Sequence, residues 1–154
     1  QRRPTPMPSN RERLTTPIKR AVQTRAHNYC EYCRCPGDYA TDSFTVDHIL
    51  PRRAGGTNAL DNLAWACYGC NGRKQAKTHA RDPDTDQLVS LYNPRTQRWA
   101  DHFCWHKNNL ILRGKTAIAR ATVEALSLNR PTVVNLRRLL VAAKLHPPDR
   151  LSDV

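Results

Sequence analysis

The sequence lacks the long apolar segments that membrane proteins need. No run reaches the roughly 18 residues required to cross a bilayer as a helix, and no apolar stretch of the signal-peptide type opens the chain. The first residue is Gln rather than Met, so we expect a piece of a longer product, with a removed leader or a fused partner left open. The sequence therefore predicts no membrane-spanning segment.

Large aromatic and acidic residues are also scarce. There are only two Phe, and hydrophobic residues make up 39% of the 154 positions, which predicts one compact domain with a modest core. A small core leaves little free energy above chain entropy, so a bound metal would help to stabilise it. Asp and Glu number 13 against 25 Lys and Arg, for a formal net charge of +12. This excess favours polyanionic partners, chiefly nucleic acid, but identifies no activity.

The cysteines are spaced as metal ligands. Four of the six form two Cys-x-x-Cys turns, Cys30 with Cys33 and Cys67 with Cys70, and two distant turns of this kind are the usual way to build a tetrahedral zinc site. Four thiolates leave no open position, so this zinc would be structural. Cys35 could compete as a ligand, and four reduced core cysteines or two disulfides are the alternatives. The spacing favours a reducing, cytoplasmic compartment.

The first half of the chain combines a polar arm with short regular elements. Residues 1–16 are basic and Pro-rich, which predicts a flexible arm. We expect a short helix at about 18–27, because a Thr-Pro pair precedes it and apolar residues recur at helical spacing. Residues 44–49 resemble a strand that Pro51 ends, and a helix is expected to start near Tyr68.

The second half predicts mixed structure. Turn-forming residues fill 79–97, and the expected elements are two strands at 99–105 and 110–112 and two helices at 116–128 and 132–145. Thr116 is the expected cap of the first of these helices. In the last helix we expect the inward residues to be Val134, Leu139, Leu140 and Ala143. We expect Arg130, Arg137 and Arg138 on a solvated face, with phosphate binding as the less favoured alternative.

A set of residues suited to phosphodiester hydrolysis lies between and beside the cysteines. Asp47 and Asn71 offer hard oxygen ligands that suit magnesium, with manganese as an alternative ion. With no imidazole among the ligands, the preference moves away from zinc and nickel. His48 is the natural general base, because an imidazole ordinarily titrates near neutral pH. Strand alternation points Asp47 and His48 to opposite faces, so a shared site needs the strand to end or bulge there.

Basic residues flank this set on both sides. The loop that follows His48 contains two glycines, which allow backbone to approach a phosphate closely. Asn71, Lys74 and Lys77 are three or four residues apart and would share one helix face. The candidate nucleic-acid contacts are Arg52, Arg53, Arg73, Lys74 and Lys77.

These motifs together resemble the HNH endonuclease family. The likeness is close over about 30–77, where it includes both Cys-x-x-Cys turns and the stretches VDHILPR, GGT, LDNLAWAC and CNGRK. LYNPRTQRWADHF and LNRP extend it over 17–148. The resemblance implies an α+β fold with a small ββα-metal core and a structural zinc, flanked by an N-terminal helix and by a C-terminal β-hairpin plus two helices. The core would span 28–80 and its C-terminal support 81–148, with a tail at 149–154.

The resemblance also implies an activity. It predicts a metal-dependent endonuclease that hydrolyses DNA and leaves 5′-phosphate and 3′-hydroxyl ends, with Asn71 at the third signature position in place of His. Asn62 would orient His48 and shape the loop. Intrinsic specificity for double-stranded DNA should be weak, because such units grip backbone phosphates, so a protein partner or fusion would supply targeting. The alternatives are a zinc-stapled nucleic-acid-binding module without catalysis, or the nuclease domain of a larger bacterial or phage-type defence or restriction system.

Overall fold

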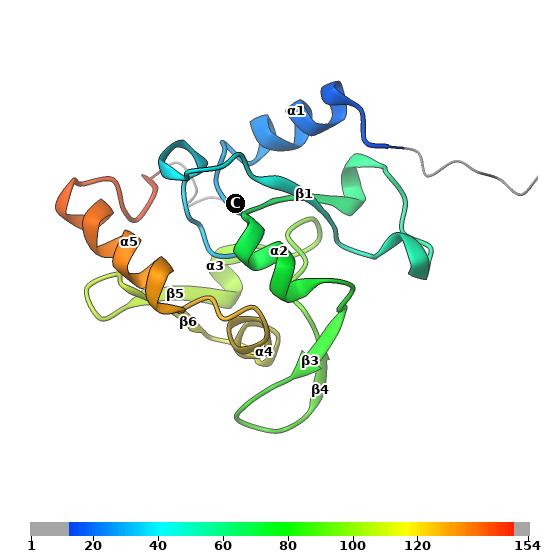
Figure 1. The fold of residues 1–154 in the computed structure, drawn as a ribbon. Coiled ribbons are helices and arrows are strands. Elements are labelled where there is room, and N and C mark those ends of the chain that lie inside the picture. Colours follow the sequence, from blue (N-terminus) through cyan, green and yellow to red (C-terminus); the bar gives the residue numbers. More distant parts are fainter. Residues whose placement is uncertain (1–12, 150–154) are drawn as a thin grey trace, which may run out of the picture.

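The computed structural model describes residues 13–149, so the predicted arm at 1–16 and tail at 149–154 lie almost wholly outside the described residues. The elements in chain order are α1 (Thr16–Arg25), β1 (Thr45–His48), β2 (Leu63–Ala66), α2 (Tyr68–Lys74), β3 (His79–Arg81), β4 (Leu88–Ser90), α3 (Trp99–His102), β5 (Phe103–His106), β6 (Ile111–Gly114), α4 (Ala117–Ala125) and α5 (Pro131–Ala142) (Figure 1). Among residues 13–149, no helix combines the length and apolar character that a membrane crossing requires.

The predicted ββα core is confirmed. β1 and β2 pair antiparallel from Thr45 opposite Ala66 to His48 opposite Leu63, and all four residues of β2 are buried. α2 follows β2 directly and contacts β1. α2 ends at Lys74, because Gln75 adopts a left-handed φ of 50°. Lys77 therefore lies beyond the helix that was expected to carry it.

α1 covers the outer side of this core. It begins with Thr15 as the N-cap, whose hydroxyl accepts the Ile18 amide at 3.4 Å, a residue or two before the predicted start. Val22 is fully buried. The Arg25 guanidinium donates to the carbonyls of Leu60 and Leu63, which fixes the end of α1 to the entrance of β2.

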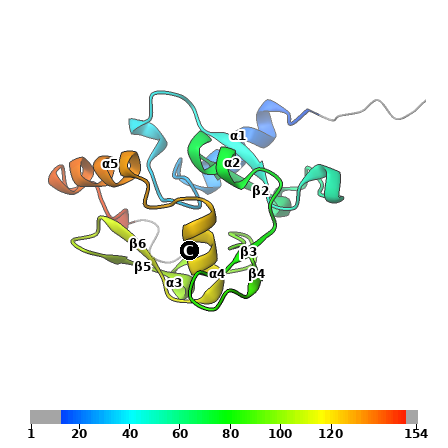
Figure 2. The ribbon, with the colours of Figure 1, turned by 60° about the horizontal axis from the view of Figure 1, so that its bottom comes forward.

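The C-terminal support consists of the β5–β6 hairpin with α4 and α5 beside it (Figure 2). Thr116 caps α4 as predicted. Residues 99–102, expected as strand, instead form the helical turn α3. Trp99 stacks on Phe103 with ring centroids 5.4 Å apart. In a strand these two residues would be about 13 Å apart, so the stacking requires the helical turn.

The β3–β4 hairpin was not predicted. Its strands have three residues each, and none of them is fully buried, so no hydrophobic alternation marks them. The turn between them is held from outside. The Asp82 carboxylate accepts two hydrogen bonds from the Arg120 guanidinium of α4, at 2.8 and 2.9 Å. A long-range ion pair therefore fixes this hairpin, which local pattern cannot reveal.

The predicted orientation of α5 was right for Leu140, which is buried, and for Arg138, which is exposed, but it was wrong for Arg137, Leu139 and Ala143. Arg137 is only 3% exposed and Leu139 is 69% exposed. The Arg137 guanidinium donates to the carbonyls of Leu110 (3.0 Å) and Leu128 (2.8 Å) and lies 5.0 Å from the centroid of the Trp105 ring. These carbonyls need donors once they are buried, and arginine can satisfy several at once.

Candidate active site and metal centre

The four predicted cysteines converge on one point in the core. The sulfurs of Cys30, Cys33, Cys67 and Cys70 all lie within 4.8 Å of one another, and all four residues are buried. The Cys33 and Cys67 sulfurs are 3.8 Å apart. Zinc–sulfur bonds of about 2.3 Å in a tetrahedron give an edge of about 3.8 Å, so this donor set fits a structural zinc ion. All six cysteines are free thiols, and Cys35 is outside the cluster.

Two local structures present these sulfurs. In the first turn, Cys30 donates its amide to the Cys35 carbonyl at 2.9 Å, and Arg34 adopts a φ of 63° that closes the turn. In the second, Cys67 is the N-cap of α2, and its sulfur accepts the Cys70 amide at 3.4 Å. The first turn is joined to β2 because the Trp65 amide donates to the Glu31 carboxylate at 2.7 Å.

A separate hollow of about 510 Å³ lies at the end of β1. Of the predicted site residues, it gathers five: Asp47, His48, Arg52, Arg53 and Asn71. The β1–β2 register is regular up to its last pair at His48, so the strand ends there, which was one of the two ways to bring Asp47 and His48 to one site. Asn62, Arg73, Lys74 and Lys77 do not line this hollow.

The Asp47 carboxylate has partners on both oxygens. The Tyr32 hydroxyl donates to Oδ2 at 2.6 Å, and Lys74 Nζ lies 3.2 Å from Oδ1 and 3.0 Å from Oδ2. Asp47 is 3% exposed and Lys74 is 2% exposed. Burial raises the pKa of the Asp47 carboxyl above its usual range, while the Lys74 charge and the Tyr32 hydrogen bond pull the pKa down. Tyr32 was not anticipated, because nothing local marks its hydroxyl as a partner.

Lys74 occupies a different place from the surface position predicted for a phosphate contact. Besides Asp47, its ammonium donates to the carbonyls of His48 (3.1 Å) and Ile49 (3.3 Å). Lys74 therefore holds the end of β1 against α2. Arg73 and Lys77 remain exposed, with their side chains bonded to nearby carbonyls of α2.

The two roles expected of Asn62, shaping the loop and orienting His48, belong to two different asparagines. The side-chain amide of Asn62 accepts from the Leu50 backbone N–H (2.9 Å) and donates to the carbonyls of Leu50 (3.0 Å) and Thr57 (2.9 Å). Asn62 therefore shapes the loop. The side chain that contacts His48 belongs to Asn58, whose Oδ1 lies 2.8 Å from His48 Nε2. Because an amide oxygen can only accept, the Nε2 atom carries the proton and Nδ1 of the neutral ring is left unprotonated.

The loop also depends on a glycine. A Cβ atom on Gly56 would lie 1.7 Å from the Leu50 carbonyl oxygen, closer than any side chain can approach. The two backbone segments that cross here carry the rim of the hollow, since Arg52 and Arg53 lie between them. Of the glycine pair noted in the sequence, Gly56 therefore serves this close crossing, whereas Gly55 has open space around it and adopts a φ of 94°.

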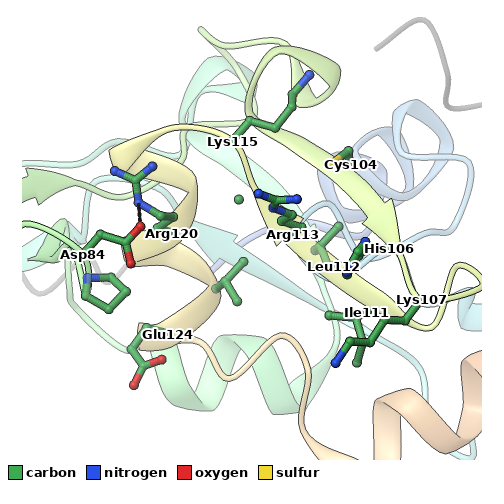
Figure 3. A pocket seen from close by; sticks show the side chains of 13 residues that line it. Asp84, Cys104, His106, Lys107, Ile111, Leu112, Arg113, Lys115, Arg120 and Glu124 are labelled. Carbon is green, nitrogen blue, oxygen red and sulfur yellow. Dashed lines mark ion pairs between the residues drawn. The ribbon is translucent and has the colours of Figure 1, made fainter.

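A larger hollow of the described chain lies elsewhere. It measures about 820 Å³, lies between β5–β6 and α4, and contains none of the predicted site residues (Figure 3). Its lining mixes charges. Arg120 pairs with Asp84 at 3.1 Å, and Arg113, Lys115 and Glu124 surround them. The predicted site residues thus lie in the smaller hollow at β1 and not in this larger one.

The comparison with protein families gives one match. Residues 30–77 match the family model described as HNH endonuclease. Neither the curated proteins nor the solved structures contain a match to the chain. The matched segment holds the four clustered cysteines, both strands of the β1–β2 pair and α2. Residues 30–77 are therefore similar to the HNH endonuclease family, and they carry four clustered cysteines in an arrangement that could hold a zinc ion.

Proposed function

We propose that the protein is a metal-dependent endonuclease that hydrolyses DNA phosphodiester bonds. One observation supports this most directly: within a domain of a nuclease family, the hollow at the end of β1 gathers Asp47, His48 and Asn71. These supply a general base and two hard oxygen ligands, which are the groups that hydrolysis of a phosphodiester requires.

His48 acts as the general base in this proposal. Its contact with Asn58 leaves Nδ1 unprotonated in the neutral ring. That nitrogen accepts the proton of the attacking water, which turns a weak nucleophile into a stronger one as the bond to phosphorus forms. Asn58 holds the ring in the tautomer and orientation that this step needs.

Asp47 and Asn71 would hold one divalent cation, magnesium or manganese. Such an ion would supply positive charge beside the scissile phosphate and the leaving 3′ oxygen. Tyr32 and Lys74 already engage both oxygens of Asp47, so Lys74 would share the carboxylate with a bound cation. The Lys74 ammonium also has the carbonyls of His48 and Ile49 as acceptors, which would keep it partly satisfied.

The basic residues would bind the DNA backbone. Arg52 and Arg53 line the hollow, while Arg73 and Lys77 are exposed beyond it. Phosphate contacts position a duplex without reading its sequence, so we propose weak intrinsic specificity on double-stranded DNA, with a partner or fused domain supplying the target. Free thiols suit a reducing compartment such as the cytoplasm.

The test is cleavage of supercoiled plasmid with magnesium, with end analysis of the products. His48→Ala should abolish cutting, whereas His106→Ala, an exposed histidine of the other hollow, should cut like the parent. EDTA should stop the reaction. If His48→Ala cuts as fast as the parent, the mechanism is wrong.

A second candidate is a nucleic-acid-binding module without catalysis. The buried ion pair of Asp47 with Lys74 favours it, because a carboxylate already paired needs no metal. Salt-sensitive DNA binding without cleavage in magnesium, manganese or nickel would support this candidate over the nuclease.

A further inference from the structure

The thiolate cluster has a contact from outside the HNH segment. Arg130, the residue before α5, directs its guanidinium at two of the four sulfurs: Nη1 lies 3.6 Å from Cys70 Sγ, and Nη2 lies 3.4 Å from Cys67 Sγ. Nη1 also donates to the Ser127 carbonyl at 3.2 Å. The side chain does not cap the helix that it precedes, so the guanidinium is held by the two sulfurs and the Ser127 carbonyl.

The chain has room for this contact because of a second glycine. A Cβ atom on Gly69, between the two cysteines of the second turn, would lie 2.5 Å from Arg130 Nη2. Any larger residue at this position would push the guanidinium away from the sulfurs. The contact of Arg130 with the sulfurs therefore requires glycine at position 69, although the two residues are far apart in sequence.

Helix α5, which follows Arg130, also contacts the first cysteine turn. The Arg137 guanidinium donates to the Cys33 carbonyl at 3.3 Å. One arginine of the C-terminal support thus contacts the sulfurs of the second turn, and another contacts the backbone of the first. Together they join the C-terminal support to both halves of the cluster.

Electrostatics explains why a cation belongs there. Zinc bound by four thiolates carries a formal excess of two negative charges, and this centre is buried. A buried uncompensated charge is costly, and N–H groups aimed at ligand sulfurs tune such centres. The guanidinium supplies both the charge and two directed donors.

We propose that Arg130 completes the zinc centre by donating N–H···S hydrogen bonds to the thiolates of Cys67 and Cys70, and that it slows zinc loss. Arg130 is thus a positioning residue for the metal. The HNH segment 30–77 then holds zinc fully only when the C-terminal support is present. The proposal concerns metal retention and does not depend on nuclease activity.

The test compares Arg130→Met, Arg130→Lys and the matched control Arg138→Met, an exposed arginine of the same helix. Zinc transfer to a chromophoric chelator gives the release rate, and cobalt substitution gives the sulfur-to-cobalt charge-transfer band. Arg130→Met should release zinc about 10-fold faster or more, in line with the loss of other outer-shell partners. Its band should move to lower energy, because sulfurs without a hydrogen bond donate charge more easily. For Arg130→Lys, the release rate and the band energy should lie between those of the parent and Arg130→Met. For Arg138→Met, both should match the parent.

Gly69→Ala is the second variant, because it displaces the guanidinium while keeping the charge. It should shift the cobalt band in the same direction. Parent-like release and an unchanged band in Arg130→Met would overturn the proposal. A lowered melting temperature with an unchanged band would overturn it too, since Arg130 would then act by packing alone. A parent protein that carries no zinc would also refute it, whatever its activity on DNA.

Discussion

The thiolate cluster and the hollow at the end of β1 lie on the same ββα core but are built in opposite ways. In the cluster, four soft ligands face one another in the interior, and the nearest cation, Arg130, contacts the sulfurs from outside. In the hollow, the carboxylate of Asp47 already has an internal cation, Lys74. A closed set of ligands suits a permanently bound ion. If the hollow holds the proposed exchanging cation, the buried Lys74 would keep the Asp47 carboxylate paired whenever that cation is absent.

Loss of zinc should produce the largest effect. Structural zinc contributes about 10–16 kcal/mol in small domains, comparable with the whole stability of about 5–15 kcal/mol that a domain normally has. Cys70→Ser should therefore unfold the core, as seen in a thermal melt by circular dichroism with metal analysis. Asp47→Asn should keep its zinc and a cooperative melt. If the cysteine variant melts like the parent, the cluster is not the principal support of the core.

The second largest effect should come from replacing Lys74, the buried cation that pairs with Asp47. Lys74→Met leaves Asp47 buried without its charge partner, which typically costs about 3–5 kcal/mol. Urea unfolding would measure the loss. The double variant Lys74→Met with Asp47→Asn should recover a large part of it, because the uncompensated charge is gone. Additive losses in the double variant would show that the ion pair is not what Lys74 contributes.

The two asparagines should separate loop stability from catalysis. Asn62→Ala removes three hydrogen bonds to the Leu50 and Thr57 backbone and should cost about 1–3 kcal/mol in unfolding experiments. Asn58→Ala should lower the plasmid cleavage rate about tenfold or more, a larger loss of rate than that of Asn62→Ala, because His48 loses its orienting contact. The reverse pattern would return the orienting role to Asn62.

The smallest expected effect is a pH dependence of the melting temperature that arises at the β3–β4 hairpin, where Asp82 pairs with Arg120 of α4. Hydrogen bonds from Arg120 hold the pKa of Asp82 well below its usual range. The folded state therefore binds this proton less tightly than the unfolded state. The stabilisation is complete above the ordinary Asp pKa of about 3.9 and is lost as the pH falls below it. Melting temperatures recorded between neutral pH and acid should fall less steeply for Asp82→Asn than for the parent. If the two curves of melting temperature against pH are parallel, the Asp82–Arg120 ion pair does not stabilise the β3–β4 hairpin.

The ββα core could be predicted from the sequence because the patterns that indicate it are local. Cysteine spacing, the Asp-His pair at a strand end and the Thr116 cap each depend on a few consecutive residues, and the structure places each of these elements where the pattern indicated. Beyond the helical turn α3, the missed β3–β4 hairpin and the exposed Leu139, the errors concern charged and polar side chains. Lys74 and Arg137 were expected outside and lie inside, and the contact expected of Asn62 is made by Asn58.

Thus the sequence by itself determined the ββα core and the four clustered cysteines, and it predicted which residues are suited to hydrolysis. Tertiary structure decided which cations are buried and what they hold: Lys74 on Asp47, Arg137 on backbone carbonyls and Arg130 on the thiolates. The reason is physical. A long basic side chain goes wherever buried acceptors lack donors, and those acceptors come from distant parts of the chain that meet only in the folded state.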